Sequence, residues 1–237
     1  RAANIATFFL YFAFSSALFL LSLNLQQLQG FRPGTAGVLI LPATILIPFL
    51  SGPSGVLTDR RGPSFQMRAG PLIFAAGALL LLSGGSGARY IRDLFPGMLL
   101  LGLGMVVVIP AITTSAIAVP AEKTGTASGI NNAAARISGL FAVALGGLLL
   151  AAGYRYFYAR GLERLALEPG MREQLLDQAA RMLTAPLPDS LETAAQAVQG
   201  ARREAWASAY RLAMGANIVA ALAAARAGWR IPKRLPG

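Results

Sequence analysis

The stretch Gly55-Val-Leu-Thr-Asp-Arg-Arg-Gly62 connects two long segments, residues 35–57 and 69–88, that contain no charged side chain. At about 1.5 Å per helical residue, roughly 20 residues cross a hydrocarbon core of roughly 30 Å. Each segment is therefore long enough to span a membrane as a helix. We expect the charged octet between them to form a loop at the membrane surface.

The composition of the whole chain agrees with this interpretation. Of its 237 residues, 55% are hydrophobic and only 13% are charged, as is typical of polytopic membrane proteins. The net charge is +11, but the basic residues are scattered, so we predict no nucleic-acid binding. There is no cysteine and no histidine, which excludes a disulfide framework and a thiolate metal site, and no cofactor is predicted.

Apolar segments of suitable length predict an all-α fold with six transmembrane helices. The expected spans are residues 5–25, 35–57, 69–88, 94–119, 130–153 and 209–229. Residues 154–208 carry acids and bases in equal number, and we expect them to form an amphipathic helical hairpin outside the membrane. Residues 230–237 form a basic tail. A hydrophobic span follows almost directly after Arg1, so we expect the sequence to be the C-terminal part of a longer protein.

The charged octet also carries a recognisable pattern. Gly55, Leu57, Asp59, Arg60 and Gly62 form Gly-x-Leu-x-Asp-Arg-x-Gly, which resembles the signature loop of the major facilitator superfamily. In that family the loop follows the second helix of a six-helix half. The sequence departs from the family where Pro63 and Ser64 replace further basic residues. The resemblance implies that the chain is one six-helix half of a major facilitator fold.

A second resemblance narrows the branch. Gly125-Thr-Ala-Ser-Gly-Ile-Asn-Asn132, followed by Arg136 and Gly139, is similar to the fourteen-helix drug:proton antiporter-2 family. That resemblance implies that these are the last six helices and that residues 154–208 lie on the extracytoplasmic side. Charge alone does not settle the orientation, which depends on the resemblance.

The resemblance implies a gating role for the octet, carried by Gly55, Asp59, Arg60, Arg61 and Gly62. Asp59 is expected near the start of the helix that follows, where the positive end of a helix dipole stabilises a carboxylate. Arg60 is expected to pair with the other half when the cytoplasmic ends are together. The alternative is that the arginines only set the topology and the octet is a simple turn.

Several polar or helix-bending residues in the spans are candidates for a transport path. They are Gln26, Gln27, Pro42, Pro110, Asn131, Asn132 and Arg136. Each has a structural alternative: the glutamines cap a helix end, the prolines bend helices, and the asparagines bridge helices. Arg136 either faces a cavity or acid within the membrane or, only some six residues into its span, reaches the cytoplasmic surface.

These observations favour a transporter over an enzyme. The sequence shows no nucleophile–base set, metal cluster or phosphate-binding glycine loop. The resemblance implies proton-coupled efflux of drugs or other small solutes by alternating access across the bacterial cell membrane. Its partners are then a small-molecule substrate, the proton gradient, the lipid bilayer and a missing N-terminal half. Because all acidic residues are expected in loops, the coupling carboxylate should lie in that half. A facilitator or importer of a polar metabolite, and a non-transporting receptor or scaffold, remain alternatives.

Overall fold

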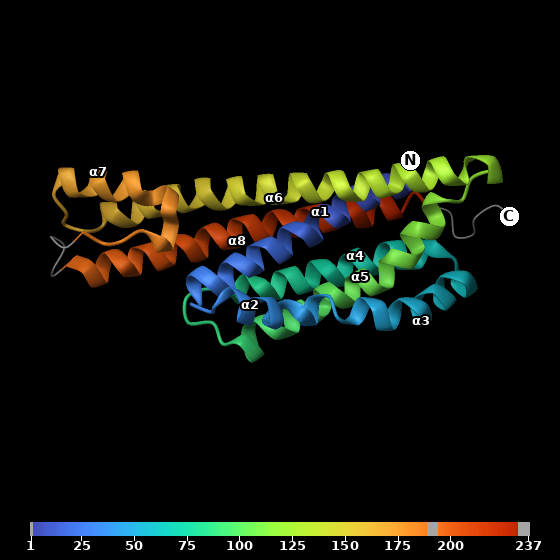
Figure 1. The fold of residues 1–237 in the computed structure, drawn as a ribbon, viewed down its shortest axis with the longest axis horizontal. Coiled ribbons are helices and arrows are strands. Elements are labelled where there is room, and N and C mark those ends of the chain that lie inside the picture. The colour runs from blue at the N-terminus through green and yellow to red at the C-terminus, as the bar shows by residue number, and fades with distance from the viewer. Residues whose placement is uncertain (1, 189–193, 232–237) are drawn as a thin grey trace.

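The structure, a computed structural model, describes residues 2–188 and 194–231. This part of the chain is helical and contains no β-strand (Figure 1). Six helical segments are long and apolar enough to cross a membrane, which confirms the predicted all-α polytopic fold. In chain order the α-helices are α1 (Ala2–Leu23), α2 (Pro33–Ile40), α3 (Leu46–Arg61), α4 (Pro63–Leu80), α5 (Phe95–Ala116), α6 (Thr124–Glu163), α7 (Pro169–Asp177) and α8 (Ala195–Gly228). Short 3-10 or π segments extend or join them: η1 (Asn24–Leu28), η2 (Leu41–Ala43), η3 (Leu81–Ser83), η4 (Tyr90–Leu94), η5 (Ala121–Lys123) and η6 (Gln178–Thr184).

The spans form two groups that share a long axis. Helices α1, α6 and α8 pack against one another, and α4 packs against α5, which in turn contacts α3. Contacts of α4 with α8 join the two groups. In Figure 1 this arrangement is an elongated bundle, with the α7 region extending beyond one end.

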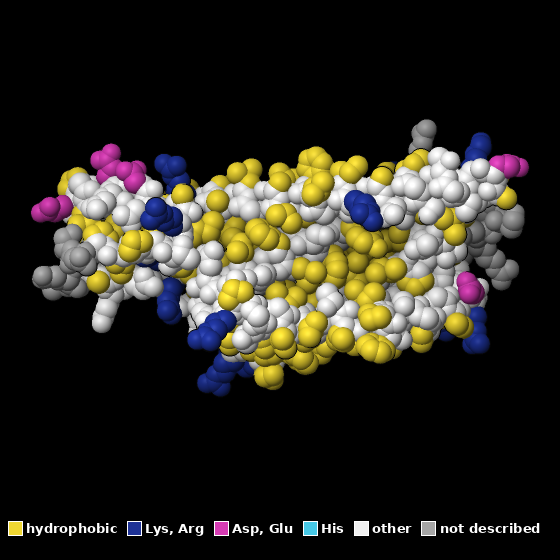
Figure 2. Space-filling model, in the orientation of Figure 1, with side chains coloured by type: hydrophobic (Ala, Val, Ile, Leu, Met, Phe, Trp, Pro, Cys, Tyr) yellow, Lys and Arg dark blue, Asp and Glu magenta, His cyan; other side chains and the backbone are white. Residues whose placement is uncertain are grey.

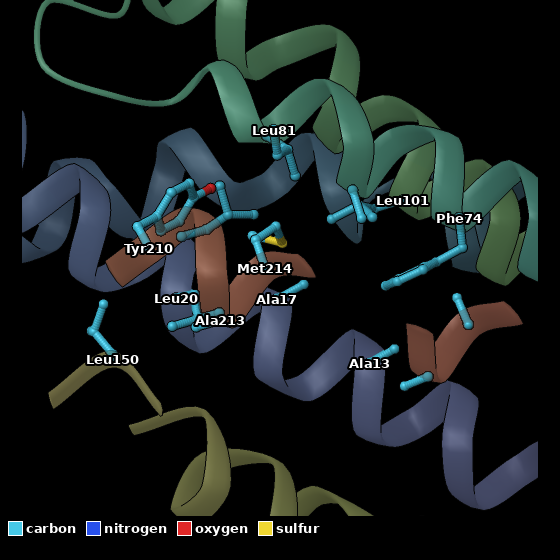
Figure 3. Close-up of a cluster of buried hydrophobic side chains, with 14 of the residues drawn as sticks. Ala13, Ala17, Leu20, Phe74, Leu81, Leu101, Leu150, Tyr210, Ala213 and Met214 are labelled. Atoms are coloured by element: carbon cyan, nitrogen blue, oxygen red, sulfur yellow. The ribbon is translucent and has the colours of Figure 1, made fainter. Parts of the chain in front are cut away.

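The core lies where α1, α4, α5 and α8 meet. Small residues of α1 and α8 allow these helices to approach closely, and larger side chains fill the remaining space. Figure 3 shows this cluster, with Ala13, Ala17, Leu20, Phe74, Leu81, Leu101, Leu150, Tyr210, Ala213 and Met214 labelled.

Helices α4 and α5 touch through their backbones. A methyl group placed on Gly77 would lie 2.8 Å from the carbonyl oxygen of Gly97, and one placed on Gly104 would lie 2.7 Å from the backbone nitrogen of Phe74. A larger residue at either position would push the helices apart. These glycines therefore set the distance between α4 and α5.

The second span is not one continuous helix. Helix α2 ends at Ile40, η2 follows, and α3 begins at Leu46. Pro42 lies in η2 and has no N–H to donate to the preceding turn, which favours a break in the α-helix here. The bend expected at this proline is therefore a full interruption.

The last two long helices continue beyond the predicted spans. Helix α6 runs ten residues past Gly153, or about 15 Å, and α8 begins at Ala195. We call residues 154–188 and 194–208 the extension. Its interior holds two stacked pairs of buried aromatic rings, Tyr154 with Tyr158 in α6 and Trp206 with Tyr210 in α8, where Tyr210 belongs to the adjoining span. Of the predicted basic tail, residues 232–237 lie outside the described residues.

Candidate functional site

The charged octet is the end of a helix and not a loop. Helix α3 continues to Arg61, and only Gly62, at φ 77°, separates it from α4. The N–H of Gly62 donates to the carbonyl oxygen of Thr58 at 2.8 Å, and Pro63 starts the next helix. A left-handed glycine followed by a proline at the first helical position makes so short a connection possible. The prediction of a loop over Gly55–Gly62 was wrong for this reason.

The charged side chains of the octet are exposed at one end of the bundle. Asp59, Arg60 and Arg61 line a hollow of about 440 Å³ together with Gly62, Pro63, Thr58 and Thr114. Asp59 lies in the last turns of α3, so the expectation that it begins the following helix was also wrong; its own helix presents a negative dipole end there. In Figure 2 most charged side chains lie toward the two ends of the molecule. The surface between them carries many hydrophobic side chains and a basic side chain.

A buried polar network fastens the octet to the neighbouring helices. The amide nitrogen of Gln66 donates to the carbonyl oxygen and the hydroxyl oxygen of Ser54, each at 2.9 Å. The Thr58 hydroxyl donates to the amide oxygen of Gln66 and lies 3.1 Å from the carbonyl oxygen of Ser54. The Ser54 hydroxyl in turn reaches the carbonyl oxygen of Val107 at 3.3 Å. All three side chains are buried, so α3, α4 and α5 are tied together directly beneath the charged residues.

Gln66 and Ser54 belong to the octet's site but were not predicted from the sequence as part of it. A signal was present, because Gln66 is a polar residue whose neighbours in α4 are largely apolar. Polar side chains within a span are costly unless they are hydrogen-bonded, so a partner was required. Its identity depends on how α3 and α4 fold back on each other, which the sequence does not reveal.

Asn131 and Asn132 have different surroundings. The Thr7 hydroxyl of α1 donates to the side-chain oxygen of Asn131 at 2.7 Å and lies 2.9 Å from the carbonyl oxygen of Ala3. Asn131 therefore bridges α6 to α1. The side chain of Asn132 is exposed on the outer face of α6.

Arg136 is exposed and deep within α6. The helix begins at Thr124, so Arg136 follows 12 residues later, about 18 Å along the axis. No ion pair of Arg136 occurs within the described part of the chain. The sequence predicted that this span begins at Ile130, six residues before Arg136, whereas the helix begins at Thr124.

Gln26 and Gln27 lie at the other end of α1. Gln26 donates to the hydroxyl of Ser22 at 2.8 Å, and Gln27 accepts a hydrogen bond from the indole nitrogen of Trp206 at 3.2 Å. Thr7 and Gln27 are 20 residues apart, or roughly 30 Å along the helix. The glutamines and Asn131 therefore cannot belong to a single binding site within this chain.

Pro42 packs against helix α5, and Pro110 is part of that helix. A methyl group placed on Gly102 of α5 would lie 3.1 Å from the carbonyl oxygen of Pro42 and 2.9 Å from that of Ala43. Pro110 lies within α5, and the nearby Thr113 hydroxyl donates to the carbonyl oxygen of Ile109 at 3.1 Å. This is the expected bond to the preceding turn, which supports a helix next to a proline.

Burial is unequal among the spans. In the most apolar stretch of each, 11% of residues are buried for Pro33–Arg61 and 33% for Ala121–Glu163, against 44–56% for the other four. The outer face of the Ala121–Glu163 span carries Asn132 and Arg136, so part of this uncovered surface is polar. Polar and charged groups within a span rarely face lipid.

The sequence profile of the Major Facilitator Superfamily matches residues 3–159, more than half of the chain. The chain belongs to the Major Facilitator Superfamily. The chain is therefore a membrane transporter protein and not an enzyme. Its six spans form half of a major facilitator fold. Among the described residues no group of His, Cys, Asp or Glu is arranged to hold a metal ion.

Individual members of this superfamily are also similar to the chain. It is 34% identical over 176 residues to the multidrug resistance protein Stp of Mycobacterium tuberculosis, covering 74% of the chain and 32% of that protein. It is 32% identical over 143 residues to the tetracenomycin C resistance and export protein of Streptomyces glaucescens, covering 59% of the chain and 26% of that protein. The matched part of the chain thus spans about a third or less of the length of these curated relatives. The family and the relatives identify the chain as a multi-pass protein of the bacterial plasma membrane.

Proposed function

We propose that the chain is one half of a secondary active transporter that exports drugs or other small solutes in exchange for protons, by alternating access. A second half of the same protein covers the exposed face and completes the substrate path. The relatives named for multidrug resistance and for tetracenomycin C export support the choice of export.

Arg136 is the observation that carries this proposal. Its side chain is exposed on α6 about 18 Å from the start of the helix. A charge that faces lipid in the middle of a membrane costs about 3 kcal/mol or more. A polar partner or a water-filled cavity on this side of α6 removes that cost. The Pro33–Arg61 and Ala121–Glu163 spans have the fewest buried residues. The second half would cover the exposed surfaces of both.

The charged octet would act as the gate at its end of the bundle. Asp59, Arg60 and Arg61 are exposed and rest on the rigid Ser54–Thr58–Gln66 network. Ion pairs from these side chains to the other half can form only in the state that brings the two ends together. Such contacts stabilise one of two conformations, which is what alternating access requires.

Proton coupling would depend on a carboxylate of the other half. The described acidic residues lie toward the ends of the bundle or in the extension, and none occupies the middle of a span. The substrate path would run between the halves at mid-membrane depth, with Pro42, Pro110, Asn132 and Arg136 on this side of it. We further propose the fourteen-helix drug:proton antiporter-2 branch, with the extension on the extracytoplasmic side.

Efflux of a lipophilic cationic dye from vesicles containing the full-length protein tests the proposal. We expect efflux that depends on an imposed proton gradient and stops when a protonophore is added. Efflux that persists without the gradient would contradict proton coupling. No efflux of several such dyes in either condition would contradict drug export.

A further inference from the structure

A hollow of about 420 Å³ lies between α6 and the α7–η6 part of the extension. Its α6 side consists of Leu148, Ala151, Ala152 and Arg155. Its other side consists of Leu176 and Asp177 of α7 with Ala179 and Ala180 of η6. The hollow is therefore apolar except for one basic and one acidic side chain.

This hollow lies where the exposed side chains of α6 change from apolar to basic and aromatic. Leu148, with 62% of its surface exposed, is the last large aliphatic side chain that α6 exposes before the extension. Arg155, Tyr156 and Arg160 follow, and the Arg160 guanidinium lies 4.9 Å from the centre of the Tyr156 ring. Tyrosine and arginine are typical of the membrane–water interface. The Leu148 side of the hollow thus faces the acyl chains, and the Arg155 side faces the headgroups.

The two charged side chains of the hollow form no ion pair with each other. The ion pairs within the described chain are Arg92 with Asp93 and Arg172 with Glu163. Arg155 and Asp177 are in neither pair, although both line the same hollow. A guanidinium and a carboxylate are thus available there for a ligand that carries both an anionic and a cationic group.

We propose that the hollow binds a zwitterionic phospholipid with a primary ammonium headgroup, of the phosphatidylethanolamine type. Arg155 receives the phosphate, for which a guanidinium is well suited. Asp177 accepts hydrogen bonds from the ammonium group, and an acyl chain lies along Leu148, Ala151 and Ala152. An adjoining hollow shares Arg155 and Asp177 and adds Arg172 and Glu173, one charge of each sign. The charge balance therefore favours this lipid over phosphatidylglycerol, whose headgroup brings no cation to Asp177. Phosphatidylcholine is less suitable because its quaternary ammonium has no N–H to donate.

This site requires only that the protein is in a membrane, so it is independent of the proposed transport function. The lipid would bind beneath α7 and η6 and hold the extension against α6. A bound lipid is therefore expected to lower hydrogen exchange in residues 171–180.

Native mass spectrometry of the delipidated full-length protein tests the assignment. Phosphatidylethanolamine, phosphatidylcholine and phosphatidylglycerol with identical acyl chains are titrated separately. We expect the tightest binding for phosphatidylethanolamine, weakened about tenfold by Arg155→Gln or by Asp177→Asn, as for one lost charge-assisted contact. Arg164→Gln and Glu168→Gln change exposed charges of the same signs outside the hollow and should leave binding unchanged.

The Asp177→Asn variant also separates the headgroups. It should weaken phosphatidylethanolamine binding without weakening phosphatidylglycerol binding, and exchange in residues 171–180 should no longer respond to phosphatidylethanolamine. Equal affinity for the three lipids, unchanged by either variant, would overturn the proposal and indicate non-specific lipid only. Circular dichroism of each variant verifies that the helices remain folded.

Discussion

The side-chain amide of Gln66 in α4 donates to the carbonyl oxygen of Ser54 in α3 at 2.9 Å, across the single-residue turn at Gly62. Ser54 is one turn before Thr58, which also contacts Gln66. One buried amide therefore holds the end of α3 that carries Asp59, Arg60 and Arg61. This contact stabilises α3 as a helix through the charged octet up to Arg61, the last residue before the turn.

We expect Gln66→Leu to destabilise the protein by about 1–3 kcal/mol, the cost of leaving buried polar groups unsatisfied. For a chain of this size that corresponds to a fall in Tm of roughly 2–12 °C. Thermal unfolding in detergent, followed by circular dichroism, measures it. Gln174→Leu is the matched control because Gln174 is exposed on α7. Equal Tm values for the two variants would show that the network does not stabilise the fold.

Asp59→Asn separates gating from folding. The Asp59 side chain is exposed and forms no ion pair within the described chain, so the substitution should leave insertion unchanged and should not lower the Tm. If its charge stabilises one state of the transporter, transport should fall by about fivefold or more. Dye efflux in vesicles measures this, with Glu122→Gln, another exposed carboxylate, as the control. Full activity of the Asp59 variant would remove the gating role.

Arg136→Ala tests the exposed face of α6. Arg136 has no ion-pair partner in the described chain, so its removal should not lower the Tm. Transport should fall by about tenfold or more, as expected for the loss of a charge-assisted contact between Arg136 and the other half. Arg136→Lys should retain part of the activity because it keeps the charge. Unchanged transport in the alanine variant would instead mean that the side chain reaches the membrane surface.

Thr7→Val removes the partner of Asn131 with little change in shape. The hydroxyl of Thr7 lies 2.7 Å from the side-chain oxygen of Asn131, and hydrogen bonds between membrane helices contribute about 0.6 to 2 kcal/mol. We expect a fall in Tm of a few degrees. Thr126→Val, at an exposed position near the start of α6, is the control. If the two variants unfold at the same temperature, Asn131 does not stabilise the α1–α6 contact.

Hydropathy and one motif were enough to predict six spans and the family, because each depends on residues close in sequence. The surroundings of the candidate residues were not predictable in the same way. Gln27 and Trp206 are 179 residues apart, and Thr7 and Asn131 are 124 apart, so only the packed bundle brings them together. The octet was mistaken for a loop because its charges suggested a surface turn, whereas Ser54 and Gln66 stabilise it as a helix.

The packing of α4 on α5 gives a pair of substitutions with opposite expected signs. A methyl group on Gly77 would lie 2.8 Å from both the carbonyl oxygen of Gly97 and the backbone nitrogen of Leu101, neither of which can move without shifting its helix. Gly77→Ala should therefore destabilise the protein by about 1–3 kcal/mol through overpacking. A methyl group on Gly200 in α8 would meet no atom within 4 Å, so Gly200→Ala should stabilise by about 0.5–1 kcal/mol through helix propensity. Thermal unfolding of the two variants side by side measures both effects. A Gly77 variant as stable as the Gly200 variant would mean that α4 and α5 do not touch through their backbones.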